Sequence, residues 1–262
     1  MSRSTLLLVA LLSHFLAFSP QAKATHAKSI RVATYLEPPM VDFVDGHFVG
    51  ENIEVAKLLA KKLDKDIYFI RCPIARCLSM IEKGHADMIL SLRKTQARQQ
   101  YMTYLTPPFK VQHFPLRFYV LKERKLEISK FEDLNALSVG VVRGAAYFDR
   151  FDQDKSINKV EVTGHRQLIQ MLLKSRIDTF LEREETIIPL IEAQVYQSKI
   201  TLAQYQFDKS VDSYIAISKK SSFHKDIGKM SEQLTLMIKS GEIQQLLKDK
   251  RVPDLSRQKN RQ

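Results

Sequence analysis

The segment LSMIEKGHADMILS, residues 78–91, decides the fold, because a similar segment returns 91 residues later. The second segment, IQMLLKSRIDTFLE, covers residues 169–182 and also has Met at its third, Lys at its sixth and Asp at its tenth position. Each begins with the apolar spacing of a helix and ends in a short apolar run typical of a buried strand. Two copies of one helix–strand unit predict a chain made of two similar halves.

The same alternation of strands and helices surrounds each copy. In the first half, strands are expected at residues 30–35, 66–70 and 87–92, and helices at 52–63 and 75–83. In the second half, strands are expected at 138–142, 159–164 and 178–182, and helices at 165–175 and 186–195. Such alternation implies two α/β lobes, each with a mostly parallel sheet flanked by helices.

Two further strands, at residues 114–124 and 210–221, are expected to cross between the lobes as hinge strands. The first lobe is then discontinuous and is closed by helices near the C-terminus. We expect the first lobe at residues 25–118 plus 214–252, the second at 119–213, and a disordered tail at 253–262.

The first 24 residues have the pattern of a cleavable secretory signal peptide. Arg3 precedes an apolar run at residues 6–18, and Ala22 and Ala24 have the spacing of a cleavage site. The run is too short to span a bilayer comfortably, and an uncleaved anchor is the alternative. We expect cleavage near Ala24 and a soluble, exported protein.

Composition and motifs argue against several classes of function. The chain has 262 residues, 44% of them hydrophobic, and a formal net charge of +12. Its Lys and Arg residues are spread along the sequence, which favours a solvated basic surface over binding to nucleic acid. The sequence has no nucleotide-binding loop, Ser-His-Asp arrangement or metal-ligand cluster, so we expect no cofactor and no metal. The scattered histidines, His165 among them, are interpreted mostly as surface residues.

Cys72 and Cys77 are the only cysteines. In an exported protein, two cysteines at this spacing predict a disulfide that closes a short loop. Free thiols are the alternative, and two cysteines are too few ligands for a metal site.

Four stretches of the chain, in their order and spacing, resemble family 3 of the bacterial extracellular solute-binding proteins, which have the type II periplasmic binding fold. They are IRVATYLEPPMVDFVDGHFVGENIEVAKLLAKKL from residue 30, MIEKGHADMILSLRKTQARQQYMTYLTPPF from residue 80, FEDLNALSVGVVRGAAY from residue 131 and DSYIAISKKS from residue 212. The resemblance implies a monomer with two lobes, two hinge strands and a small ligand held in the cleft. It also implies closure on binding and delivery to an inner-membrane ABC transporter permease.

Ligands of open parallel sheets bind at the carboxyl ends of the strands, which are here Tyr35, Ser91, Val142 and Glu182. After Ser91 the chain reads LRKTQAR, and Thr95 is expected to cap a helix whose third residue is Arg98. Helix-start amides together with a guanidinium suit a carboxylate. The resemblance agrees, because amino-acid binders of the family have a T-x-E-R stretch here whose Arg grips the ligand carboxylate.

This chain departs from that stretch, because Ala97 replaces the usual Glu. Leu92, Arg93 and Lys94 lie at the same rim, and their two cations favour an anionic ligand group. For Arg93, Lys94 and Arg98 alike, a solvated surface side chain is the alternative.

The first loop and the cysteine loop contribute three more candidates to the site. Tyr35 and Glu37 lie where the family places an aromatic wall, although a Tyr buried under Pro38 is an equal alternative. Arg76 lies between the cysteines, where the disulfide loop could present it either to the cleft or to the surface.

In the second lobe, RGAAY places Arg143, Gly144 and Ala145 after the strand at 138–142. Amino-acid binders have a hydroxyl residue here, whereas this chain keeps only the backbone amides. They also have an Asp near the end of the strand at 178–182, where the candidates are Glu182 and Arg183. If Glu182 faces the cleft, it can pair with an amine of the ligand, whereas Arg183 in that place would favour a second anionic group. The repeat favours Glu182, because Glu182 has the same position in the second segment as Ser91 has in the first.

The first hypothesis for function is a non-catalytic protein that captures a carboxylate-bearing, amino-acid-like ligand for ABC-type uptake. One alternative is an enzyme on the same fold, similar to the periplasmic cyclohexadienyl dehydratases, with Glu37 or Glu182 as the general acid. Another is a binding module that serves a sensor partner.

Overall fold

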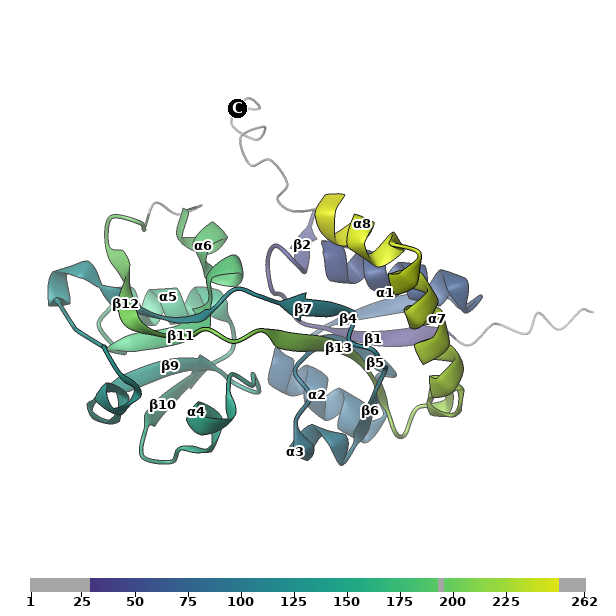
Figure 1. The fold of residues 1–262 in the computed structure, drawn as a ribbon, viewed down its shortest axis with the longest axis horizontal. Helices are drawn as coiled ribbons and strands as arrows, with labels where there is room; N and C mark the ends of the chain where they lie inside the picture. The colour runs from purple at the N-terminus through teal and green to yellow at the C-terminus, as the bar shows by residue number, and fades with distance from the viewer. Residues whose placement is uncertain (1–28, 193–195, 250–262) are drawn as a thin grey trace, which may run out of the picture.

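A computed structural model describes residues 29–192 and 196–249, which form two lobes, each built around one sheet (Figure 1). The expected signal peptide, the expected tail at 253–262 and the expected helix end at 193–195 lie outside these residues. Among the described residues, no helix has both the length and the apolar character needed to cross a membrane.

The two sheets repeat one pattern of strand order. The first has the order β4-β1-β5-β13-β6, and the second has the order β10-β9-β11-β8-β12. The strands of the first sheet are β1 (Ile30–Thr34), β4 (Ile67–Arg71), β5 (Met88–Leu92), β6 (Met102–Tyr104), β13 (Val211–Ser218) and the short β7 (Lys110–Gln112), which pairs with β13. Those of the second are β8 (Leu116–Leu121), β9 (Ser138–Val142), β10 (Asn158–Val162), β11 (Thr179–Arg183) and β12 (Ile200–Phe207).

The repeated helix–strand unit takes the same place in both lobes. Helix α2 (Ile74–Lys83) leads to β5, and helix α5 (His165–Leu173) leads to β11. Strands β5 and β11 each have a parallel neighbour on one side and an antiparallel crossing strand on the other. The prediction of two matched α/β lobes is therefore confirmed, with sheets that are mixed because the crossing strands run antiparallel.

The chain crosses between the sheets twice, side by side in the middle of the molecule (Figure 1). Strand β7 (Lys110–Gln112) pairs with β13 in the first lobe, and β8 pairs with β11 in the second from Leu116. The return passes from β12, which ends at Phe207, to β13, which begins at Val211. Whereas the sequence placed the lobe boundaries at 118/119 and 213/214, inside β8 and β13, we propose residues 113–115 and 208–210 as the hinge.

Helices cover both faces of the first sheet. On one face lie α1 (Glu51–Lys62) and the C-terminal helices α7 (Ile227–Lys239) and α8 (Glu242–Asp249) (Figure 1). Val32 and Ile217 on the sheet pack with Leu59 and Leu234 on these helices. Helix α2 covers the opposite face, where Ala33 of β1 packs with Cys77 and Ile81 of the helix.

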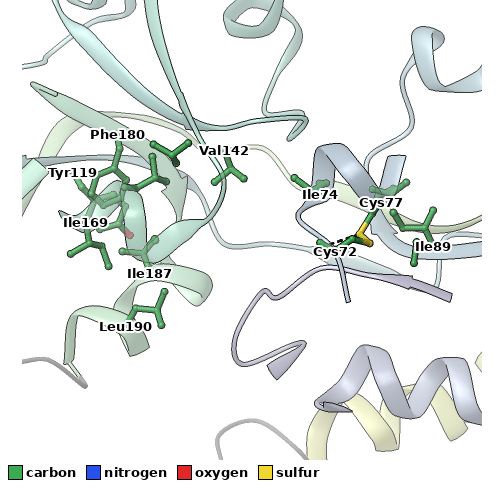
Figure 2. Packing of buried hydrophobic residues seen from close by; sticks show 14 of the residues in the cluster. Cys72, Ile74, Cys77, Ile89, Tyr119, Val142, Ile169, Phe180, Ile187 and Leu190 are labelled. Atoms are coloured by element: carbon green, nitrogen blue, oxygen red, sulfur yellow. Dashed lines mark hydrogen bonds between the residues drawn. A yellow bond between two sulfur atoms is a disulfide. The ribbon is translucent and has the colours of Figure 1, made fainter. Parts of the chain in front are cut away.

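The second sheet is also buried on both faces. Helices α5 and α6 (Glu184–Glu192) pack on the face that carries Tyr119 and Phe180, whose rings stack 4.8 Å apart. The other face holds an aromatic cluster around Phe118 and Phe151. Figure 2 shows the apolar packing of the two lobes approaching one another at Ile74 and Val142.

Short elements complete the fold. They are the hairpin β2 (Asp42–Val44) and β3 (His47–Val49), α3 (Gln96–Gln99), α4 (Asp149–Gln153), and the 3-10 turns η1 (Lys122–Arg124), η2 (Phe131–Ala136) and η3 (Ser222–Asp226). The hairpin turns at Asp45 and Gly46, both of which have a positive φ.

Candidate functional site

A cavity of about 620 Å³ lies between the two sheets. The four strand ends named from the sequence, Tyr35, Ser91, Val142 and Glu182, all line it. Eight of the expected ligand-binding residues take part in its lining: Tyr35, Glu37, Ser91, Leu92, Arg93, Arg98, Ala145 and Glu182. Residues from both lobes therefore face one shared space.

The other four expected residues are not part of the cavity lining. Arg76 is exposed, because α2 turns Ile74 and Cys77 inward and leaves Arg76 on its outer side. Lys94 is exposed at the rim. Arg143 bonds to Glu161 at 2.8 Å on the surface of the second lobe. Gly144 contributes its carbonyl oxygen, which accepts a hydrogen bond from Arg98.

Arg98 joins the two lobes. It is the third residue of α3, and the Thr95 side chain caps this helix by accepting a bond from the Arg98 backbone N–H at 3.3 Å, as the sequence predicted. The guanidinium donates to the carbonyl of Arg93 and to the carbonyl of Gly144, each at 2.8 Å. Only 6% of Arg98 is exposed, so a permanent positive charge lies buried where the lobes meet.

Arg93 makes a second bridge beside it. Its guanidinium donates to the backbone carbonyl of Tyr147 and to Asp149 Oδ1 at 3.0 Å, with Asp152 at 3.8 Å. All three partners belong to the second lobe, so Arg93 ties the end of β5 to α4 and to the loop before it.

Ser91 has an unusual backbone at the end of β5. Its φ of 61° lies in the left-handed region, which non-glycine residues seldom adopt and which tends to occur at functional sites. Its carbonyl accepts a bond from the Tyr35 hydroxyl at 2.8 Å. Burial, followed by the nearby Glu37 charge, raises the pKa of Tyr35 well above its usual value, so the hydroxyl stays protonated and able to donate.

Glu182 has a partner on each carboxylate oxygen. Oε1 accepts from the Arg183 backbone N–H at 2.9 Å, and Oε2 lies 3.2 Å from His165 Nε2. Burial lowers the pKa of His165, but the hydrogen bond and charge of Glu182 outweigh burial, so this pKa is raised. Arg183 lines the cavity too, and its guanidinium donates to the carbonyl of Phe114 at 2.7 Å.

His165 was interpreted as a surface residue, and the structure corrects this. Its side chain is only 10% exposed and lies at the start of α5, facing the cavity. A single His after Gly164 gives no periodic signal in the sequence, because its partner Glu182 comes from another element, β11.

Glu37 differs from Glu182 in its partners. Its backbone is fixed by paired bonds with Val41 at 2.9 and 3.0 Å, yet within the described residues its buried Oε2 has no hydrogen-bond partner. Burial is the largest cause that raises its pKa to about 7. The carboxylates of Glu182 and Glu185 raise it further, while His165 and Lys110 act in the opposite direction.

Sequence reasoning missed a group of lining residues that follow the outer strands: Arg71, Thr163, Arg166 and Gln167. Arg71 ends β4, and residues 163–167 follow β10. The strand-end rule could have found them, because β4 and β10 run parallel to β1 and β9 and finish at the same edge.

The disulfide between Cys72 and Cys77 forms as predicted, with the sulfur atoms 2.06 Å apart. It ties the segment after β4 to the first turn of α2 (Figure 2). Cys72 itself lines the cavity, so the disulfide supports one wall. In the described part of the chain, no cluster of His, Cys, Asp and Glu is arranged to hold a metal ion.

A cavity with charged residues in its lining, between two α/β lobes that are joined by paired crossing segments, defines the class of two-lobed ligand-binding proteins. Residues 30–249 match the family described as bacterial extracellular solute-binding proteins, family 3. The chain belongs to this family, and the family predicted from the sequence is confirmed.

Three comparisons show the range of its relatives. The histidine-binding periplasmic protein of Escherichia coli K12 is 28% identical over 188 residues, covering 68% of this chain and 70% of the relative. An amino acid ABC transporter substrate-binding protein of Streptococcus pneumoniae, bound to L-arginine, has a TM-score of 0.68 and 22% identity over 85% of this chain and 94% of its own. A histidine kinase sensor domain has a TM-score of 0.71 and 14% identity over 84% and 95%. The two solved structures show that this fold is common to all three chains.

Proposed function

We propose that this protein captures a small carboxylate-bearing, amino-acid-like ligand in the cavity and delivers it from the periplasm to an ABC-type permease. The observation that carries the proposal is the buried Arg98 guanidinium at the junction of the lobes, which lines the same cavity as Glu182. A guanidinium has five N–H donors, so Arg98 can hold two carbonyls and still donate to a carboxylate.

The second lobe supplies the complement for an ammonium group. Glu182 lies at the end of β11, and an ammonium can approach its oxygens while Arg98 holds the carboxylate of the same ligand. Ligand contacts with both lobes favour the closed arrangement, which couples binding to hinge motion. The amino-acid ligands of the relatives support this class of ligand for the present chain.

The matched relatives with named ligands are binding proteins, which supports a non-catalytic role. A dehydratase-like enzyme would need a carboxyl general acid in the cavity, and Glu37 and Glu182 are the candidates. NMR of a bound ligand after long incubation distinguishes the two: the ligand stays unchanged if the protein only binds it. A role as the binding module of a sensor is the other alternative, since a sensor domain has the same fold. Binding of the protein to a permease in membrane vesicles would favour the uptake role over the sensor role.

The test is a thermal-shift screen with amino acids, polyamines, dicarboxylates and small peptides, followed by Arg98→Ala. A ligand at 100 times its dissociation constant adds about 2.7 kcal/mol of stability to the wild type. We expect Arg98→Ala to abolish the shift while the ligand-free melting temperature stays within a few degrees. Lys94→Ala is the matched control, because Lys94 is an exposed cation of the same loop outside the cavity lining. An unchanged ligand response in Arg98→Ala would contradict the proposal.

A further inference from the structure

Arg183 connects the wall of the cavity to the hinge. It is the last residue of β11, and the pairing of the strands places it opposite Leu116, the first residue of β8. Its guanidinium donates a hydrogen bond of 2.7 Å to the backbone carbonyl of Phe114, within the hinge segment proposed at 113–115. Because Arg183 also lines the cavity, one side chain touches both the binding space and a segment that crosses between the lobes.

The buried charge of Arg183 depends on this bond. Only 7% of the residue is exposed, and burial lowers the pKa of its guanidinium. The carboxylates of Glu182, Glu185 and Glu37 act in the opposite direction, but in the described part of the chain none of them forms an ion pair with it. A buried charge needs hydrogen-bond partners, so the Phe114 carbonyl is a contact that Arg183 loses only at a cost in free energy.

The two crossing segments are joined next to this carbonyl. His113 Nδ1 lies 3.0 Å from Ser210 Oγ, so a hydrogen bond links the first crossing to the second. Phe114 precedes Pro115, and a residue before proline is confined to extended conformations. A hinge motion changes the dihedral angles of a few such residues, and with them the direction of the Phe114 carbonyl. The bond from Arg183 therefore depends on how the lobes are arranged.

We propose that Arg183 is a positioning residue that holds the hinge in the closed arrangement, whether or not a ligand is bound. A protein that is already set to close binds more tightly, because apparent affinity scales with the fraction of molecules in the competent arrangement. The effect on affinity rests on the proposed function, whereas the effect on the hinge does not. Arg183 acts at the hinge, whereas Arg98 acts where the lobes meet at Gly144.

The test is small-angle X-ray scattering of the whole mature protein without ligand. Arg183→Met removes the charged donor and keeps an unbranched side chain, so it should give a larger radius of gyration than the wild type. Arg183→Lys keeps a positive charge and N–H donors, and it should return the radius of gyration most of the way to the wild-type value. Titration calorimetry with L-arginine and L-histidine, the ligands named for two relatives, then measures affinity. Whichever of the two binds the wild type should bind Arg183→Met about tenfold more weakly.

Arg166→Met is the matched control. Arg166 is another arginine of the second lobe that lines the cavity, but it is exposed and lies in the first turn of α5, not at the hinge. The same substitution there also removes a cation from the cavity, and it should leave the radius of gyration of the ligand-free protein unchanged. A larger radius of gyration in both variants would indicate a general effect of charge and would overturn the role of Arg183.

The remaining outcomes separate this inference from the proposed function. An equal radius of gyration for the wild type and Arg183→Met would overturn the inference, even if the variant bound ligand more weakly. Arg183→Gln, which keeps a polar side chain without the charge, gives the same comparison if Arg183→Met does not fold. The ligand response of Arg98→Ala decides the proposed function separately, because the scattering experiment uses no ligand.

Discussion

At the scale of single residues, the partners of a carboxyl group decide what it can do. Glu182 is held by His165 and a backbone N–H, so it presents a satisfied, oriented carboxylate. Glu37 is half-buried, its buried Oε2 has no hydrogen-bond partner within the described residues, and its pKa is raised to about 7. The sequence named both residues as candidates, but it gave no sign of this difference, because the neighbours of Glu37 come from elements far along the chain.

The raised pKa of Glu37 predicts that the stability of the protein falls as the pH rises. The folded protein holds the proton of this carboxyl up to about pH 7, whereas the unfolded chain releases it near the usual pKa of 4.5. The contribution to stability is therefore complete below pH 4.5 and is lost as the pH rises through 7. Between pH 5 and pH 8 the free energy of unfolding should fall by about 2 kcal/mol from this group.

Urea unfolding at both pH values measures this effect, with Glu37→Gln as the control for the other titrating groups that face Glu37, including His165. The variant should lack this loss of stability, because glutamine does not titrate. An equal change of the free energy of unfolding with pH in the wild type and in Glu37→Gln would contradict the prediction.

At the scale of elements, the repeated unit was predictable because its signals are local. Apolar spacing placed the helix–strand joins, and the strand at 138–142 matches β9 residue for residue. The sequence gave no prediction for β6, β7 or β12, because short or irregular strands are defined by the strands they pair with. β12 shows this directly, since its pairing with β8 shifts register between Leu202 and Gln206.

The disulfide stabilises the connection between β4 and the start of α2 in the first lobe. Replacing both Cys72 and Cys77 with Ala should lower the free energy of unfolding by about 2 kcal/mol, because a short closed loop restricts the unfolded chain. Urea unfolding of the variant measures the loss, and the reduced wild type should show a similar one. Two alkylatable thiols in the protein as secreted, without reductant, would contradict the pairing.

At the scale of the whole molecule, the lobes meet along one edge of the cavity. Arg98 and Arg93 reach across to the carbonyls of Gly144 and Tyr147. Gly144 has a φ of 85°, and a Cβ atom there would lie 3.0 Å from the Cα of Ala75, so the absence of a side chain allows the close approach. This edge favours the closed arrangement that ligand binding needs.

The ion pair between Arg93 and Asp149 gives a way to test this edge without changing the cavity. Asp149 is not part of the cavity lining, and its side chain is 79% exposed. Asp149→Ala should weaken ligand binding about two- to fivefold, since a single exposed charge pair contributes little. Glu132→Ala is the matched control, because Glu132 pairs with Arg150 inside the second lobe.

Titration calorimetry measures the ligand affinity of both variants, and small-angle X-ray scattering reports the separation of the lobes. Asp149→Ala should give a larger radius of gyration in the ligand-free protein, and Glu132→Ala should not. Equal effects of the two substitutions would show that the Arg93 bridge does not influence closure.

The sequence by itself determined the two α/β lobes, the disulfide pairing and most of the strand ends that line the cavity. These features follow from apolar periodicity, from residue type and from the rule that parallel strands finish at one edge. Only the tertiary structure decided that His165 is buried, that Glu182 and Arg183 both reach the cavity, and that Arg76, Lys94 and Arg143 do not line it. The physical reason is that these environments depend on segments far apart in sequence, such as β11 beside the start of α5, which only the folded chain brings together.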